Sequence, residues 1–278
     1  MLTLWTRKGF GAEFRWQHRK RKSRYMLETL FMSAEFPDKI RISGRLNRQS
    51  AGNPPIGGAP QRLHARLPRL RDDDIVQLNR MNENIKAILL GLALGDGYLT
   101  PFVGKSRRSR TEIKGDNKNL SYLKWLHLQL KPLGCSDLKP KKNYHQHRFY
   151  TKTTEEIGKL RELFYLKRKK VVPKNIKELL RNPLTLAVWY QDDGTLDCRS
   201  KYHYNAMFAT YCFSFSDCKL LAKALRKNFN LDARVCKCRM RGKTRYRLYI
   251  TSSSMGHFIR LISPYINSCF RYKIRKFN

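Results

Sequence analysis

Residues Ile85–Tyr98 read I-K-A-I-L-L-G-L-A-L-G-D-G-Y, and residues Leu184–Thr195 read L-T-L-A-V-W-Y-Q-D-D-G-T. Each stretch is an apolar run long enough for a buried helix and too short to span a membrane. Each run ends at a glycine, the residue that most easily adopts the left-handed turn closing a helix. The two stretches therefore predict two buried helices with the same kind of ending.

Asp96 and Asp193 stand directly before the final glycines of these stretches. A carboxylate at a helix C-terminus faces the negative end of the helix dipole, at a cost of about 0.3–1 kcal/mol. At the end of a buried helix it is also poorly solvated. The same unfavourable arrangement in both stretches indicates that a cation lies between the two ends. Asp192 is the second choice in the second stretch, and the plainer interpretation is that all these acids pair with nearby lysine or arginine.

The glycines inside the first stretch predict close packing of the two helices. Gly91 and Gly95 lie four positions apart, hence on one helix face, where they allow another backbone to approach. The second stretch carries Val188 and Asp192 at the matching positions. Contact from that side is therefore expected to be less close, or shifted to Ala187. Close packing would bring the two acids together.

The composition indicates a nucleic-acid partner. The 278 residues carry a formal net charge of +37, and 41% of them are hydrophobic, enough for a real core. So high a charge opposes compaction unless a polyanion neutralises it, and nucleic acid is the leading candidate. No segment is typical of a long basic amphipathic helix, so no membrane partner is expected.

The seven cysteines favour a reducing compartment. Their number is odd, all lie from Cys135 onward, and there is no C-x-x-C pair. The closest pair, Cys236 and Cys238, has no histidine at zinc-ligand spacing. We therefore expect neither a disulfide framework nor a zinc site.

Residues 1–80 differ from the rest of the chain. They contain the basic run His18–Arg24 and a linker-like stretch rich in proline and glycine within Gln49–Leu63. We interpret the region as a flexible basic extension. Its first thirty residues are also Arg-rich and poor in acids, which fits an organelle transit peptide. The same composition fits an in-frame extension of an intron reading frame.

The order of elements repeats after each acidic stretch. The pattern predicts strand pairs and helices in alternation, with Ser216 capping the second-half helix that starts at Asp217. The expected strand pairs are Tyr98–Lys114, Leu138–Thr153, Asp197–Phe215 and Ala233–Thr251, and the expected helices are Leu120–Leu133, Thr154–Leu166, Asp217–Asn228 and Ser254–Ile262. A short helix is expected just before the second acidic stretch. His147–Phe164 also aligns in letters with Tyr246–Ser263. We therefore predict an internal duplication of α-β-β-α-β-β-α units in an α+β fold.

The two acidic stretches resemble the motif of the LAGLIDADG homing endonucleases. Leu89–Gly97 and Leu186–Gly194 match that motif in register, and two copies in one chain resemble the single-chain, intron-encoded members. The resemblance covers about residues 82–278. It implies two pseudo-symmetric αββαββα repeats, with boundaries at 81–180 and 181–278. Their antiparallel sheets would form paired saddles over DNA around a central two-helix interface.

The expected active site combines two acids with two lysines. Hydrolysis of a phosphodiester needs a polarised phosphoryl oxygen and an activated water, which Mg²⁺ held by carboxylates provides. We predict Asp96 and Asp193 as the metal ligands. The resemblance implies that Lys170 and Lys273 polarise the attacking water and steady the phosphate. Tyr211 stands where related proteins often carry glutamine near the metals.

Basic residues of the predicted hairpins are the candidates for DNA contact. Alternate residues share one face of a strand, and a two-stranded ribbon fits the major groove. The residues are Lys105, Arg107, Arg108, Arg110, Lys139, Lys141, Lys142, Arg148, Arg199, Lys201, Lys237, Arg239, Arg241, Arg245 and Arg247. Many of them individually also fit a merely solvated basic surface.

These observations favour a monomeric, Mg²⁺-dependent, site-specific DNA endonuclease that cuts an intronless target site. The alternative is an intron maturase that binds intron RNA on the same scaffold without cleavage. A third, unrelated alternative is a basic ribosome-associated protein. The retained acids favour the nuclease. The expected compartment is the mitochondrion or the chloroplast.

Overall fold

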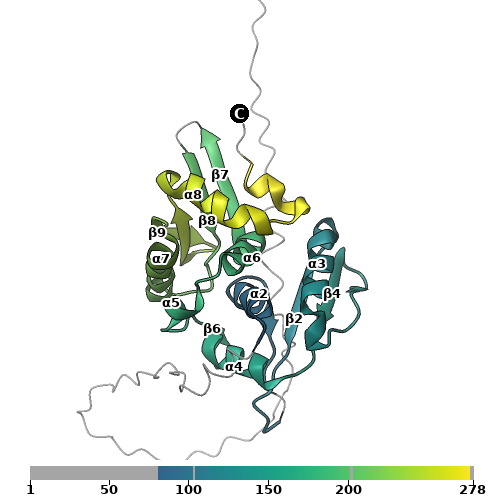
Figure 1. The fold of residues 1–278 in the computed structure, drawn as a ribbon. Coiled ribbons are helices and arrows are strands. Elements are labelled where there is room, and N and C mark those ends of the chain that lie inside the picture. The colour runs from purple at the N-terminus through teal and green to yellow at the C-terminus, as the bar shows by residue number, and fades with distance from the viewer. Residues whose placement is uncertain (1–80, 103, 201–202, 276–278) are drawn as a thin grey trace, which may run out of the picture. The chain divides into compact units, whose positions relative to one another are not determined.

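Two helices, α2 (Glu83–Leu94) and α6 (Pro183–Asp193), pack against each other at the centre of the described chain (Figure 1). The computed structural model describes residues 81–102, 104–200 and 203–275. The basic extension predicted for residues 1–80 and the candidate Lys201 lie outside these ranges. No helix within them is long and apolar enough to cross a membrane.

The first half builds one antiparallel sheet beside α2. Its strands, in the order β1-β2-β4-β3, are β1 (Tyr98–Leu99), β2 (Thr111–Asp116), β4 (Gln146–Tyr150) and β3 (Lys139–Pro140). Its other helices are α3 (Leu120–Leu130) and α4 (Glu155–Phe164). The short hairpin β5 (Tyr165–Leu166) and β6 (Lys169–Lys170) and the helix α5 (Ile176–Leu179) lead to α6.

The second half repeats this arrangement. Its sheet has the order β7-β8-β10-β9, with β7 (Gly194–Ser200), β8 (His203–Phe208), β10 (Lys243–Ile250) and β9 (Ala233–Met240). Its helices are α7 (Phe215–Phe229) and α8 (Ser252–Ile262), followed by the 3₁₀ segment η5 (Ser268–Lys273). The predicted α+β fold of two αββαββα repeats around a two-helix interface is confirmed.

The contact between α2 and α6 is tight because Gly91 of α2 leaves room for the side chain of Val188 and the backbone of Thr185 on α6. A Cβ atom added to Gly91 would lie 2.7 Å from the Cβ of Val188 and 2.8 Å from the Thr185 carbonyl oxygen. The Thr185 hydroxyl also donates a hydrogen bond across the interface to the carbonyl of Ala87 (3.0 Å). The lack of glycines in α6 therefore does not loosen the contact, contrary to the expectation from sequence.

The glycines after the two helices serve close approach and not a left-handed turn. Gly97 and Gly194, which end the two stretches, are not among the described glycines with a positive φ, so the expected left-handed closing turns are absent. A Cβ atom on Gly194 would lie 2.0 Å from the ring of Tyr190, which explains glycine at that position.

Helix α7 begins earlier than the sequence indicates. Strand β8 ends at Phe208, and α7 starts at Phe215, inside the range expected to be a strand pair. Its N-cap is Ser214 and not Ser216. The Ser214 hydroxyl accepts a hydrogen bond from the Asp217 backbone N–H, and the Asp217 carboxylate accepts one from the Ser214 N–H, both at 3.1 Å. The reciprocal pair is a capping box, which satisfies two backbone donors that the helix leaves unpaired.

Replacing Ser214 by alanine should therefore destabilise the protein by about 1 kcal/mol, the usual value of an N-cap. The matched control is Ser216→Ala, which removes only the hydrogen bond between the Ser216 and Ser214 hydroxyls (2.9 Å) and leaves the capping box in place. It should change the free energy of unfolding by less than about 0.5 kcal/mol. Urea unfolding of both variants checks the assignment, and equal losses would contradict it.

Candidate active site

The two motif acids lie at neighbouring ends of the helix pair. Asp193 is the last residue of α6, and Asp96 follows the end of α2 by two residues. The backbone N–H of Asp96 donates a hydrogen bond to Asp192 Oδ2 (3.0 Å), which ties the two ends together. The helix packing predicted from Gly91 and Gly95 thus brings the acids to one place.

The surroundings of these carboxyl groups disfavour their ionised forms. Burial raises the pKa of Asp193 well above its ordinary value, and the neighbouring charge of Asp96 raises it further. Asp96 as a whole is exposed to solvent, but the protein around its carboxyl group displaces water and raises its pKa. The positive charges of Lys170 and Lys273 oppose this increase. Two acids that oppose each other's charge form a place where a cation is favourable.

Asp192 differs from the other two acids because both of its oxygens are engaged. Oδ2 accepts the Asp96 backbone N–H, and Oδ1 accepts the hydroxyl of Tyr122 (3.0 Å). Burial, followed by the charge of Asp96, raises the pKa of Asp192 to about 7. Within the described ranges, the carboxylates of Asp96 and Asp193 make no hydrogen bond or ion pair. The oxygens of Asp96 and Asp193, unlike those of Asp192, therefore have no protein partner with which a metal must compete.

Oxygen donors of this kind fit a divalent cation such as Mg²⁺, which takes one or two carboxylates together with substrate phosphates. The residues that the structure describes contain no group of three or more His, Cys, Asp or Glu side chains that could hold a metal ion. A metal at Asp96 and Asp193 would therefore need further oxygen ligands from phosphate or water.

The two predicted lysines occupy corresponding places, one at each acidic helix end. Lys170, on β6, donates a hydrogen bond to the carbonyl of Gly95 (2.6 Å). Lys273, in η5, is buried and donates to the carbonyl of Gln191 (2.6 Å). Each ammonium group thus meets the negative end of a helix, where a cation is stabilising. Burial lowers the pKa of Lys273 to about 8, although the three neighbouring acids oppose this shift.

Tyr211 and Cys212 lie on the Asp193 side of the site. Tyr211 is half-buried and Cys212 is exposed, yet the protein around them displaces enough solvent to raise the pKa of both, to about 11 for Cys212, and the charge of Asp193 contributes to both increases. Tyr211 was singled out from the sequence. Cys212 was not, because an isolated cysteine in a loop carries no signal of its own.

Basic residues of the first sheet form one row that leads toward Asp96. Lys139 on β3 pairs with Arg148 on β4, which pairs in turn with Lys114 on β2. All three are exposed, and paired residues share a face, opposite the face that carries buried Ile113 and Phe149. Lys139 and Arg148 are among the DNA-contact candidates predicted from the sequence, and Lys114, at the end of the predicted strand pair Tyr98–Lys114, joins them here. The charge of Lys114 acts on Asp96, so the row reaches the acids.

Several basic candidates of the first half contact protein groups, including Lys139 of the row, which forms an ion pair with Asp137 (3.4 Å). Arg107 forms an ion pair with Glu162 (3.2 Å), and Arg108 donates to the carbonyl of Thr153. Arg110 pairs with Glu112 (2.6 Å) and lies over the ring of Tyr150, while Lys141 lies over the ring of Tyr144. Lys105 and Lys142 are exposed.

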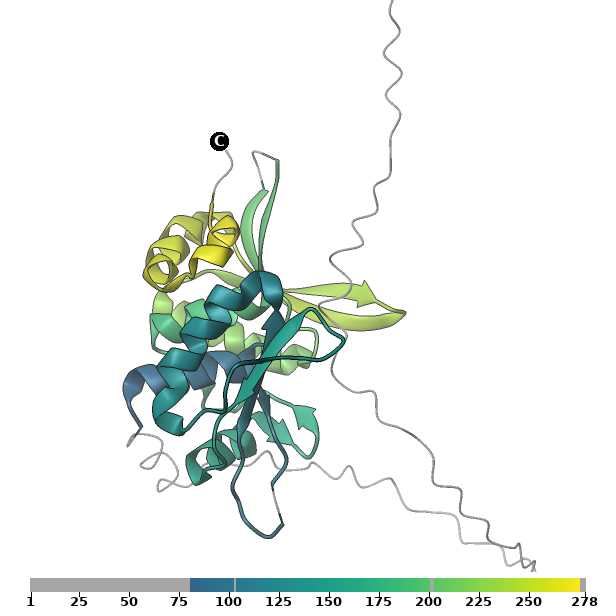
Figure 2. The ribbon, with the colours of Figure 1, turned by 90° about the vertical axis from the view of Figure 1, so that its right-hand side faces the viewer.

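The hairpin β9–β10 does not present its basic residues on one face, contrary to expectation. Arg245 and Arg247 pair with Cys238 and Cys236, while Lys237 and Arg239 pair with Tyr246 and Thr244. Lys237 and Arg239 therefore share the ribbon face that carries buried Leu248 at its base, although both side chains are exposed farther along the hairpin. Figure 2 shows this yellow-green hairpin projecting from the body. Arg241 forms its exposed turn, and the side chain of Arg199 lies outside the description.

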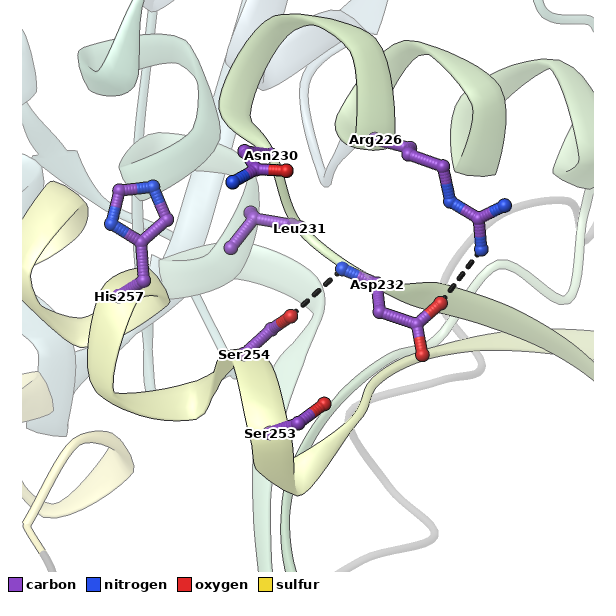
Figure 3. Close-up of a pocket in the computed structure, with 7 residues that line it drawn as sticks. All are labelled: Arg226, Asn230, Leu231, Asp232, Ser253, Ser254 and His257. Carbon is purple, nitrogen blue, oxygen red and sulfur yellow. Dashed lines mark hydrogen bonds and ion pairs between the residues drawn. The ribbon is translucent and has the colours of Figure 1, made fainter.

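A pocket on the second half lies apart from these residues (Figure 3). It is lined by Arg226, Asn230, Leu231, Asp232, Ser253, Ser254 and His257. Arg226 pairs with Asp232 (2.7 Å), and the Ser254 hydroxyl accepts the Asp232 backbone N–H (2.8 Å). These contacts fasten the α7–β9 junction to the start of α8, a structural role.

The chain is similar to proteins of two kinds, an mRNA maturase and a DNA endonuclease. It is 30% identical over 210 residues to the cytochrome b mRNA maturase bI2 of Saccharomyces cerevisiae, and the aligned region covers 70% of this chain and 48% of the relative. The chain thus spans about half the length of that maturase. It is 31% identical over 214 residues to the DNA endonuclease I-ChuI of Chlamydomonas applanata, and the aligned region covers 70% of this chain and 95% of the relative.

The fold is similar to that of a solved homing endonuclease. The structure of I-WcaI bound to its DNA recognition sequence matches with a TM-score of 0.60 at 21% identity, and covers 73% of this chain and 91% of that one. The model of the LAGLIDADG DNA endonuclease family matches residues 86–258. The match contains α6, both sheets, most of α2 and most of the described residues, and the chain belongs to the LAGLIDADG DNA endonuclease family.

Proposed function

We propose that this protein is a site-specific double-strand DNA endonuclease of the intron-homing type, which hydrolyses phosphodiester bonds with Mg²⁺. The observation that carries the proposal is the pair of available carboxylates, Asp96 and Asp193, at the joined ends of α2 and α6 with a lysine at each end. A chain that only binds nucleic acid has no need for two acids at unfavourable helix ends.

The residues have separable roles in this chemistry. Asp96 and Asp193 would hold the metal, which when bound polarises a phosphoryl oxygen and lowers the pKa of a bound water. Lys170 and Lys273 would steady the phosphate and the attacking water. The lowered pKa of Lys273, about 8, allows this side chain to take up or release a proton near neutral pH.

The exposed faces of the two sheets would bind the duplex. The row Lys139, Arg148 and Lys114 offers three positive charges across three strands. On the second sheet, half-buried Arg245 and Arg247 offer charge on one face, and exposed Lys237 and Arg239 on the other. Phosphate contacts of this kind give affinity and register, while base edges in the groove give specificity.

Loss of Lys139 or Arg148 should weaken DNA binding about tenfold, because each alanine variant loses one phosphate contact. The slope of log affinity against log salt should become shallower by about 1 in each variant. Lys223→Ala is the matched control, since this exposed lysine lies on α7. Fluorescence anisotropy across a salt series measures both quantities, and an unchanged slope in the row variants would contradict the assignment.

Plasmid cleavage tests the proposal. The wild-type protein should linearise a plasmid that carries the intronless form of its own locus when Mg²⁺ is present, and should leave it intact in EDTA. The same plasmid interrupted by the intron should resist cleavage. Failure to cut the intronless allele at any Mg²⁺ concentration would overturn the proposal.

Intron maturase activity is the second candidate function, favoured by the 30% identity to the bI2 mRNA maturase. On that alternative the protein binds intron RNA and the acids are retained without use. Binding to intron RNA in preference to an unrelated RNA of the same length, by a chain that cuts no DNA, would decide for it. We further propose that the protein acts as a monomer with repeat boundaries near residues 81–180 and 181–278, in a mitochondrion or chloroplast.

A further inference from the structure

We propose that Asp192 is a positioning residue that reaches across the helix pair and holds the backbone of Asp96 for metal binding. This inference rests on the proposed nuclease function for its catalytic consequence. Its structural part concerns the hydrogen bond from the Asp96 N–H to Asp192 Oδ2, which can be tested whether or not the protein cleaves DNA.

The need for such a residue follows from a difference between the two helix ends. Asp193 is the last residue of α6, so the regular N–H to carbonyl ladder of the helix fixes its backbone. Helix α2 ends at Leu94, and the N–H groups of Gly95 and Gly97 return to the carbonyls of Gly91 and Leu92. The N–H of Asp96, between them, donates to Asp192 and not to its own helix.

Asp192 is itself fixed by the first half of the molecule. The Tyr122 hydroxyl, from α3, donates to the second carboxylate oxygen at 3.0 Å. The Tyr122 ring is buried, stacked on Trp125 and in edge contact with Phe270. A packed ring that orients a carboxylate, which in turn orients a metal ligand, is the arrangement by which outer residues fix the ligands of metal sites.

Gly95 provides the room for this contact. A Cβ atom at Gly95 would lie 2.5 Å from Asp192 Oδ2 and 2.7 Å from Asp192 Cβ. Glycine at this position therefore lets the carboxylate lie flat against the end of α2. The corresponding position of the second motif is Asp192 itself, so the contact exists in one direction only. The site is consequently asymmetric, with Asp96 held by its partner helix and Asp193 held by its own.

The first test measures the hydrogen bond directly and needs no cleavage. In protein labelled with ¹⁵N-aspartate, the Asp96 amide should exchange with solvent at least tenfold faster in Asp192→Ala than in the wild type, since that amide has no helical acceptor. Asp192→Asn should retain slow exchange, because the asparagine carbonyl can still accept the N–H. An unchanged exchange rate in Asp192→Ala would overturn the proposal, whether or not the protein cuts DNA.

The second test separates positioning from a general loss of structure. Asp192→Ala should slow cleavage about tenfold. Its residual nicking should favour the same strand as Asp96→Asn measured alongside it, and not the strand that Asp193→Asn favours. Asp192→Asn should restore most of the rate. Tyr122→Phe keeps the ring packing and removes one hydrogen bond, so it should give a smaller loss with the same bias. Equal loss on both strands in Asp192→Ala would overturn the positioning role. A wild-type protein that does not cut DNA would refute the nuclease function alone. The hydrogen-exchange rate of the Asp96 amide would then decide whether Asp192 holds the Asp96 backbone.

Discussion

Asp96→Asn and Asp193→Asn should each slow DNA cleavage by at least about 10³-fold while leaving DNA binding nearly unchanged. The carboxylates make no hydrogen bond or ion pair within the described residues, so the substitutions remove metal-binding charge and break no protein contact. Loss of a metal contribution of several kcal/mol in the transition state corresponds to a rate loss of this order. Plasmid cleavage in Mg²⁺ gives the rate, and a gel shift in Ca²⁺ gives the binding.

The same variants should be at least as stable as the wild type without metal. The raised pKa of Asp193 means that the folded state binds its proton more tightly than the unfolded state does. The stability of the metal-free wild type therefore falls as pH rises above the unfolded carboxyl pKa of about 4. Asp193→Asn removes this loss, so its advantage in melting temperature should grow from acidic to neutral pH. Glu178→Gln, an exposed carboxylate on α5, is the control and should cut at the wild-type rate. Wild-type cleavage by both aspartate variants would refute the metal site and favour the RNA-binding alternative.

The sequence predicts the repeat and the central helices well because both depend on local burial patterns. The run Ala87–Leu94 is buried throughout, and apolar runs of that kind indicate a core helix. The repeated order of strands and helices can be read from the sequence of both halves, and the same strand order recurs in both sheets. Strand faces were harder, because the faces of β9–β10 depend on register and a shift of one residue moves every side chain to the other face.

Contacts between helices could not be predicted in detail. Asp192 was visible as a second acid beside Asp193, but its two hydrogen bonds come from residues on α3 and beyond α2, far away in sequence. Likewise, the capping box places Ser214 and not Ser216 at the start of α7, a difference within the usual uncertainty of helix boundaries. Lys114 follows the alternation of β2, yet only the pairing with Arg148 shows that it belongs to the basic row.

Gly91→Ala should reduce both stability and cleavage, because it tests the packing on which the active site depends. The added Cβ would lie 2.7 Å from Val188 Cβ and 2.8 Å from the Thr185 carbonyl oxygen. Neither atom can move by a change of rotamer, so the helices must separate. Overpacking of this kind costs about 1–3 kcal/mol. A displacement of about 1 Å between reacting groups can also lower the rate about 10²-fold.

Gly256→Ala is the matched control, since Gly256 lies inside α8 and its added Cβ would meet nothing closer than Arg260 Nη1 at 3.6 Å. That variant should gain up to about 1 kcal/mol from the higher helix propensity of alanine and should cut normally. Chemical unfolding and plasmid cleavage of the two variants compare the same substitution in two helices. A Gly91→Ala variant as stable and as active as Gly256→Ala would show that the α2–α6 interface can yield without moving Asp96 from Asp193, and the close helix packing would then not be what assembles the site.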